Sequence, residues 1–197
     1  YYEPQSPDFV CNMLPRPLRR VLDIGCGTGK LGQRLKAEGV EEVIGIELVP
    51  EAAARAREHL DQVHVGDIEE LDLLCPDGYF DAIVYSGVLE HLLDPHYELY
   101  RRRRVLRDDG FVVALLPNVQ HFSVVLELLA GRWTLQSAGQ LDATHYRWFT
   151  LHEIQKMFAA TGFAVESIVG HVFQQHPPIY QQLIDRLKPL GLLNPQF

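Results

Sequence analysis

The stretch Val21-Leu22-Asp23-Ile24-Gly25-Cys26-Gly27-Thr28-Gly29-Lys30 decides the fold. It reads as an apolar strand, a turn with three glycines and the start of a helix. Glycines at these positions allow a positive φ and let the backbone approach a ligand closely. The dinucleotide fingerprint is excluded because it needs glycine where Lys30 stands, and a P-loop is excluded because Leu31 follows in place of Ser or Thr. The pattern that is left is Asp-x-Gly-x-Gly-x-Gly.

Outward from this stretch, short apolar runs alternate with helix-like segments. This alternation predicts an α/β fold, a doubly wound and mostly parallel sheet with helices on both faces. Ligands of such sheets bind at the carboxyl ends of the strands. The expected strands are Arg20–Ile24, Glu42–Ile46, Gln62–Val65, Phe80–Tyr85 and Phe111–Leu116. The expected helices are Phe9–Leu14, Lys30–Glu38, Pro50–His59 and Asp94 to about Leu106, with a turn at Asp108-Asp109-Gly110 before the fifth strand.

The last third of the chain follows a different pattern. An apolar helix is expected at His121–Leu129, followed by an irregular segment at Gly131–Tyr146. Thr150 and Glu153 have capping-box spacing, so a helix should run from there to about Ala160. A sixth strand at Phe163–Val169 and a final helix at Ile179–Lys188 complete the prediction.

Composition limits the class of protein. The chain has 197 residues, 47% of them hydrophobic, and a net charge of −8. This is enough apolar material for one domain, and no apolar run reaches the roughly 18 residues of a membrane span. Residues 1–100 hold 19 acids and 8 bases, which argues against a nucleic-acid partner, and the run of four arginines at 101–104 is interpreted as a solvated helix face. Three widely spaced cysteines and the lack of a basic stretch before an apolar one favour a cytoplasmic protein.

The Asp-x-Gly-x-Gly-x-Gly pattern resembles motif I of class I S-adenosylmethionine-dependent methyltransferases. The resemblance implies a seven-stranded-type, Rossmann-like methyltransferase fold, S-adenosylmethionine as cofactor and S-adenosylhomocysteine as product. It implies that Asp23 attracts the ammonium or sulfonium side of the cofactor and that Glu47 binds the ribose diol beside Leu48. Asp67 then binds the adenine amino group and Ile68 packs on the ring, although Asp67 could instead cap a turn.

The stretch from Phe80 to His91 resembles the fourth-strand motif of the same family. Tyr85 and Ser86 then lie where the methionine part of the cofactor meets the substrate. The expected cofactor-binding residues are Asp23, Gly25, Cys26, Gly27, Gly29, Glu47, Leu48, Asp67, Ile68, Tyr85 and Ser86.

Residues 118–150 are expected to form a lid or substrate insertion within a single methyltransferase domain at 1–197. The stretch from Asp142 to Thr150 resembles bacterial small-molecule methyltransferases, including those near polysaccharide genes, and the order of segments is similar to the MetW type. A histidine near neutral pKa suits a general base. His145 is the first candidate, His121 the second, and His91 either a base or a support for its loop.

Purely structural interpretations stay open for the polar and the aromatic residues of this segment. His145, Asp142 and Arg147 could form a structural cluster that pins the lid. The aromatic residues could wall the acceptor pocket or belong to the core. They are Trp133, Tyr146, Trp148 and Phe149.

These observations predict methyl transfer to an oxygen or nitrogen of a small molecule, with a sugar or sugar nucleotide as first hypothesis. No metal ligand set is evident, so no metal is expected, and neither is a nucleic-acid or membrane partner; a homodimer is left open. The alternative is a non-catalytic S-adenosylmethionine-binding regulator or partner subunit of the MetW type. An RNA or protein methyltransferase is disfavoured by charge and by the lack of an Asn-Pro-Pro-Tyr-like segment, and a NAD-dependent enzyme is disfavoured by Lys30.

Overall fold

A computed structural model describes residues 7–170, 182, 185–186 and 189 of the chain. Its centre is one parallel sheet with the strand order β3-β2-β1-β4-β5. The strands are β1 (Arg20–Ile24), β2 (Glu42–Glu47), β3 (Gln62–Val65), β4 (Phe80–Ser86) and β5 (Leu106–Leu115). The order reverses between β2 and β4, so the carboxyl end of β1 lies at a switch point of the topology.

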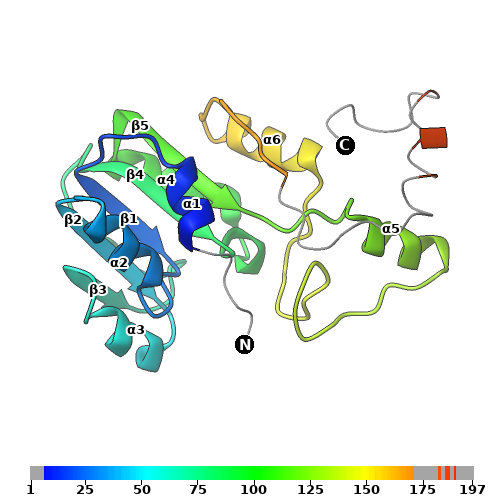
Figure 1. The fold of residues 1–197 in the computed structure, drawn as a ribbon, viewed down its shortest axis with the longest axis horizontal. Helices are drawn as coiled ribbons and strands as arrows, with labels where there is room; N and C mark the ends of the chain where they lie inside the picture. The colour runs from blue at the N-terminus through cyan, green and yellow to red at the C-terminus, as the bar shows by residue number, and fades with distance from the viewer. Residues whose placement is uncertain (1–6, 171–181, 183–184, 187–188, 190–197) are drawn as a thin grey trace.

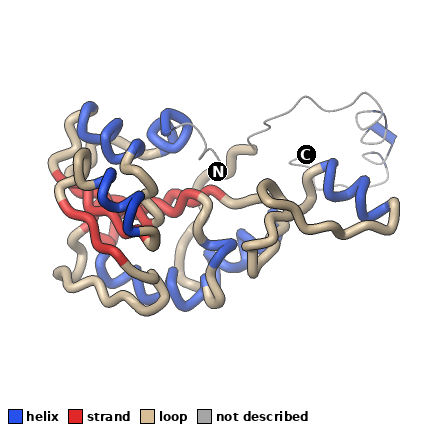
Figure 2. The backbone as a smooth tube through the Cα atoms, turned by 90° about the horizontal axis from the view of Figure 1, so that it is seen from below, coloured by secondary structure: helices blue, strands red, loops and turns tan. Residues whose placement is uncertain are grey.

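Helices cover both faces of the sheet, as Figure 2 shows with strands running between helices. Alternate residues of β1 belong to the two cores. Val21 packs in the core formed with Val10 and Leu35 of the first two helices, whereas Leu22 packs in the core that contains Leu99 and Phe158. The prediction of a doubly wound parallel sheet is therefore confirmed, with five strands in the described residues.

Six α-helices surround or extend this sheet within the described ranges. They are α1 (Pro7–Met13), α2 (Lys30–Ala37), α3 (Pro50–Ala56), α4 (Pro95–Arg102), α5 (Phe122–Leu129) and α6 (Leu151–Ala160). Two single 3₁₀ turns, η1 (Leu89–His91) and η2 (Arg103–Val105), follow β4 and α4. Thr150 caps α6 as expected, because its Oγ1 accepts a hydrogen bond from the Glu153 N–H at 3.3 Å.

The fifth strand begins earlier than its apolar run. Phe80 pairs with Leu106, but Ala82 pairs with Phe111, so the residues between them bulge out of the ladder. The expected turn at Asp108-Asp109-Gly110 is this bulge within β5. The helix expected to reach Leu106 ends at Arg102 for the same reason, because Leu106 already belongs to the sheet.

The predicted sixth strand at Phe163–Val169 is wrong. These residues follow α6 without regular structure, and Val165 and Val169 are 42% and 53% exposed. The alternating pattern is that of a strand, but the segment pairs with no strand of the described residues. The predicted helix at Ile179–Lys188 falls almost entirely outside the described residues.

The expected lid segment leaves the sheet at the end of β5. Figure 1 shows the sheet at one end of the molecule and α5 at the other. The segment returns to its origin, because Asn118 and Phe149 form a β-bridge and the Val119 N–H donates to the Phe149 carbonyl at 3.0 Å. Residues 118–150 are thus closed at their base by the backbone.

Candidate functional site

The glycine turn joins β1 to α2 at the switch point of the sheet. Gly25, Gly27 and Gly29 have φ values of 69°, 56° and 80°, in the left-handed region that favours glycine. A Cβ on Gly29 would lie 2.9 Å from Ala56 Cα, so packing against α3 also requires glycine there. A Cβ on Gly27 would have no atom within 4 Å, which leaves this part of the turn accessible to a ligand.

Glu47, the last residue of β2, holds this turn in place. Its Oε2 accepts a hydrogen bond from the Gly27 N–H at 2.8 Å, and its Oε1 accepts one from the Val49 N–H at 2.9 Å. The side chain is only 8% exposed. Each carboxylate oxygen keeps a further lone pair, so the group can still accept hydrogen bonds from a diol.

Asp23 has a buried carboxyl group, and one of its two oxygens lacks a hydrogen-bond partner among the described residues. The residue is 2% exposed, and its Oδ2 has no hydrogen-bond partner within the described part of the chain. Burial, helped by the charge of Glu47, raises the pKa of Asp23 to about 7. A buried acceptor that lacks a donor, close to an open glycine turn, fits a ligand with an ammonium group.

The residues expected around adenine lie after β2 and β3. Leu48 is 63% exposed, whereas Ile68 is 8% exposed and belongs to the core. Asp67 Oδ1 accepts a hydrogen bond from the Glu69 N–H at 2.9 Å, so this carboxylate caps a turn, which is the alternative considered for it. A contact of Asp67 with adenine stays a prediction.

Two residues predicted to contact the cofactor have side chains in the core. Tyr85 is fully buried, and its hydroxyl donates a hydrogen bond to Glu98 Oε1 of α4 at 3.4 Å. Cys26 is 7% exposed, and burial together with the charges of Asp23 and Glu47 raises the pKa of its thiol far above the usual range. The side chains of both residues therefore belong to the core.

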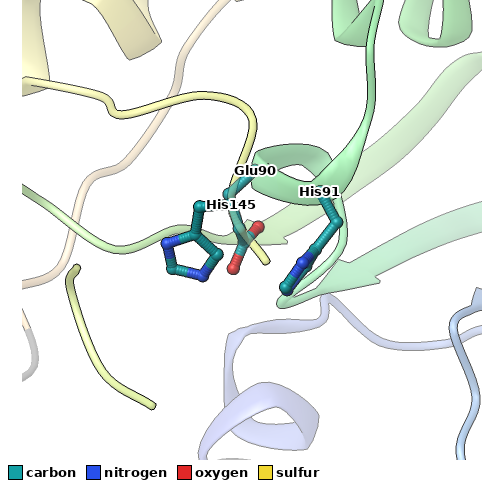
Figure 3. Close-up of side chains that lie close together, drawn as sticks. All are labelled: Glu90, His91 and His145. Carbon is teal, nitrogen blue, oxygen red and sulfur yellow. The ribbon is translucent and has the colours of Figure 1, made fainter. Parts of the chain in front are cut away.

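Glu90, His91 and His145 come together where the lid meets η1. One ligand atom from each residue lies within 4.8 Å of the other two. Figure 3 shows the Glu90 carboxyl group between the two imidazole rings. The rings contact edge-to-face with centroids 4.8 Å apart. The structure thus places His145 beside His91. Their positions in the sequence do not indicate this contact.

Glu90 and His145 of this cluster are buried, and His91 is partly exposed. Glu90 is 4% and His145 is 8% exposed, and Glu90 Oε2 and His145 Nδ1 have no partner among the described residues. Burial, with the charge of Asp142, raises the pKa of Glu90 to about 7. Burial and the neighbouring His91 lower the pKa of His145, so its imidazole is neutral at physiological pH.

The segment 118–150 is attached to η1 by hydrogen bonds to backbone carbonyl groups. The Glu90 carbonyl accepts hydrogen bonds from the N–H groups of Tyr146 and Arg147 at 2.9 and 3.0 Å, and the Arg147 guanidinium donates to the Leu93 carbonyl. Asp142 instead binds within the lid, where its Oδ1 accepts from the N–H and the hydroxyl of Thr144. The side chains of Arg147 and Asp142 thus have structural partners, Leu93 and Thr144, and do not form the expected hydrogen-bond cluster with His145.

One broad cavity connects the glycine turn to the histidine cluster. Its lining includes Gly27 of the glycine turn, Ser86 at the end of β4, and the three histidines His91, His121 and His145. The other predicted cofactor residues do not line this cavity, and Glu47 reaches it only through its hydrogen bond to Gly27. The cavity therefore joins the candidate catalytic residues to one part of the predicted cofactor site.

His121 and the aromatic residues lie elsewhere in the lid. His121 is the N-cap residue of α5, with its Nδ1 2.9 Å from Ser123 Oγ. Trp133 and Trp148 contact one another edge-to-face at 5.8 Å. Phe149 is in the core and Tyr146 is 58% exposed, and none of these aromatic residues is among those that line the cavity.

Sequence reasoning missed Glu90 and Thr144 as site residues. Glu90 precedes His91 in a turn after β4, a position where an acid could have been suspected. Thr144 had no comparable signal, because its contact with His91 depends on how the lid folds back.

Comparison with known proteins decides the family. A model of the methyltransferase domain family matches residues 5–168. The chain belongs to this family. Its class I members use S-adenosylmethionine, so the predicted cofactor and the predicted resemblance are confirmed. No helix among the described residues of this methyltransferase domain is long and apolar enough to cross a membrane.

Two curated relatives and one solved structure place the domain more closely. It is 32% identical over 168 residues to a malonyl-[acyl-carrier protein] O-methyltransferase of Geobacter sulfurreducens, covering 81% of this chain and 61% of that protein. It is 28% identical over 169 residues to a ubiquinone biosynthesis O-methyltransferase of Azorhizobium caulinodans, covering 80% and 64%. The chain thus spans less than two thirds of either relative.

The solved structure is the 1,6-didemethyltoxoflavin-N1-methyltransferase of Burkholderia thailandensis with bound 1,6-didemethyltoxoflavin and S-adenosylhomocysteine. It matches with a TM-score of 0.54 and 24% identity, covering 79% of this chain and 64% of that one. At this identity the match shows that the methyltransferase domain shares the fold.

Proposed function

We propose that this methyltransferase domain methylates an oxygen atom of a small molecule, with the histidine cluster activating the acceptor. The observation that carries the proposal is the cavity that joins Gly27 to His91 and His145. The names of both curated relatives as O-methyltransferases support oxygen over nitrogen. A sugar or sugar nucleotide is kept as the first acceptor to test, and action in the cytoplasm stays a prediction.

In this proposal the cofactor is held by the carboxyl ends of β1, β2 and β3. When bound, S-adenosylmethionine supplies a methyl group whose bond to sulfur breaks with the electron pair staying on sulfur. The unpartnered oxygen of Asp23 accepts from the ammonium group, and Glu47 accepts from the ribose while fixing Gly27. Asp67 and Leu48 lie on the side of adenine.

His145 is proposed as the base that takes the proton of the acceptor hydroxyl. Its neutral imidazole can accept a proton, because burial and His91 lower its pKa. Removing a general base typically slows such a reaction by about 10²–10⁴-fold. His121, which caps α5, is left as the second candidate.

Residues 118–150 are proposed as the acceptor lid within one domain spanning 1–197. The bridge between Asn118 and Phe149 supports this, because it closes the segment on itself beside the sheet. Chemistry that depends on positioning two reactants needs such a cover.

The test is release of S-adenosylhomocysteine from S-adenosylmethionine in the presence of sugar nucleotides, phenols, catechols and carboxylic acids. We expect turnover with an oxygen acceptor, and a loss of 10²-fold or more in kcat for His145→Gln. His152→Gln, in an exposed position on α6, is the matched control and should leave kcat unchanged. Calorimetry with S-adenosylhomocysteine should give the same affinity for both variants.

Tight binding of S-adenosylhomocysteine without turnover of any acceptor would overturn the proposal and favour the non-catalytic regulator. Turnover that is unchanged in His145→Gln but lost in His121→Gln would move the base to the second candidate.

A further inference from the structure

The cluster of Glu90, His91 and His145 contains a coordinating atom without a partner. Glu90 Oε2 has no hydrogen-bond partner among the described residues, although Glu90 is more than nine-tenths buried. An unpaired polar atom in such a place is unfavourable, and more so in a charged group. Glu90 also makes no ion pair with a lysine or arginine in the part of the chain that the structure describes.

Polar and ionisable groups gather at the cluster. Asp142 is linked to it through Thr144, whose hydroxyl oxygen lies 3.2 Å from His91 Nδ1 and donates a hydrogen bond to Asp142 Oδ1 at 2.7 Å. Two carboxyl groups and two imidazoles thus come together, and these are groups that a divalent cation can use as ligands.

The groups that form hydrogen bonds with the cluster resemble those that support the ligands of a metal site. His91 Nδ1 lies 3.2 Å from the Thr144 carbonyl oxygen, which can only accept, so Nδ1 carries the proton and donates it. This fixes the tautomer in which Nε2 has a free lone pair. The Thr144 hydroxyl donates in turn to Asp142 Oδ1 at 2.7 Å. Outer hydrogen bonds of this kind orient histidine ligands in metalloproteins.

We infer that Glu90, His91 and His145 bind a divalent transition-metal ion of the Zn²⁺ class at the acceptor end of the cavity. This inference rests on the proposed function for its catalytic meaning, but not for the existence of the site. It replaces the expectation of a metal-free protein. In this form the three side chains are ligands, and the ion would take over the role proposed for the His145 base. It would lower the pKa of a bound acceptor hydroxyl, whose proton would pass to water.

The geometry needs only side-chain adjustment to close around an ion. Ligand atoms about 2.0–2.1 Å from Zn²⁺ lie roughly 3.3 Å from one another in a tetrahedral site. The three atoms here lie within 4.8 Å, so rotations of the side chains bring them together. Two imidazoles and a carboxylate are a donor set for Zn²⁺, Fe²⁺ or Co²⁺, whereas Mg²⁺ and Ca²⁺ prefer oxygen alone. Three protein ligands leave a coordination position for an acceptor oxygen.

The experiment titrates the purified chain, with any histidine tag removed and after treatment with a chelator, with CoCl₂ followed by visible absorption and with ZnCl₂ followed by calorimetry. We expect one ion per chain. We expect at least 10-fold weaker binding for Glu90→Gln and for His145→Gln, which replace a strong ligand by a weak one of similar size. His152→Gln is the matched control and should bind as the parent does.

Binding of S-adenosylhomocysteine by the same preparations shows that each variant is folded and separates the two proposals. Co²⁺ affinity unchanged in both cluster variants, or no saturable site up to millimolar Co²⁺, overturns the metal inference and leaves the proposed function standing. A metal site without methyl transfer to any acceptor overturns the proposed function and leaves the metal inference standing.

Discussion

The carboxylate of Glu47 accepts a hydrogen bond from the backbone N–H of Gly27 at 2.8 Å, between the carboxyl ends of the neighbouring strands β2 and β1. The acid at the end of β2 and the glycine turn after β1 are therefore one structural unit. A ligand that binds to the glycine turn is therefore affected by a change of Glu47, and the reverse holds as well.

We expect Glu47→Gln to lose both stability and cofactor affinity. The amide can place an oxygen against only one of the two N–H groups, of Gly27 and Val49, and its NH₂ then faces the other donor. One buried N–H without a partner costs about 1–3 kcal/mol in unfolding free energy. Denaturation in urea and calorimetry with S-adenosylhomocysteine measure the two effects, and affinity should fall at least 10-fold. Glu51→Gln is the control, and equal affinity in both variants would exclude Glu47 as a ligand.

Gly29→Ala should destabilise the domain more than its backbone conformation alone explains. The position has a φ of 80°, and a Cβ would lie 2.9 Å from Ala56 Cα, which is backbone of α3 and cannot move aside. Gly39→Ala is a matched control, because its φ is 93° and no atom lies within 4 Å of its Cβ. The control should cost about 1–2 kcal/mol and Gly29→Ala clearly more. Equal costs would show that the close approach is absent.

Asp23 should make stability depend on pH. Its pKa is raised to about 7 in the folded protein from 3.8, so between these values the folded state binds a proton that the unfolded state has lost. Stability from this group is full below pH 3.8 and is lost as the pH rises through 7. The span of the shift corresponds to roughly 4 kcal/mol at most. We therefore expect Asp23→Asn to gain stability relative to the parent between pH 5 and 8 in thermal unfolding; parallel curves would contradict this.

Tyr85→Phe should leave cofactor binding intact. The hydroxyl lies in the core and donates to Glu98, which also accepts from Arg101 and Arg102. We expect a loss of no more than about 1 kcal/mol in stability, since one hydrogen bond to an already paired carboxylate is removed. The affinity for S-adenosylhomocysteine should stay within about twofold. A fivefold loss would mean that the hydroxyl reaches the ligand after all.

The sheet could be predicted because its determinants are local. The glycine turn, the apolar runs of β1 to β4 and the Thr150 cap each need only neighbouring residues, and the structure has them at the expected places. The start of β5 could not be found this way, because Leu106 becomes a strand residue only by pairing with Phe80. Phe163–Val169 shows the reverse case, in which an alternating pattern has no strand to pair with among the described residues.

The candidate site shows the same difference between features that depend on neighbouring residues and features that depend on distant ones. The acids at or just after the carboxyl ends of β1, β2 and β3 could be placed from the predicted strand ends. The contact of His91 with His145 could not, because the two residues are more than 50 positions apart in the sequence and meet only when the segment 118–150 folds back. Glu90 was missed for this reason too, since its burial is completed by the returning segment.

The attachment of the lid has a consequence for how such domains diversify. Its fixed points are main-chain bonds, at Asn118 with Phe149 and at the Glu90 carbonyl with residues 146 and 147. Main-chain bonds place few demands on side-chain identity, so the sequence between these points can drift or be exchanged between relatives while the cofactor half is untouched. Chimeras joined at residues 118 and 149 are thus the natural unit for transplanting acceptor preference from one relative to another.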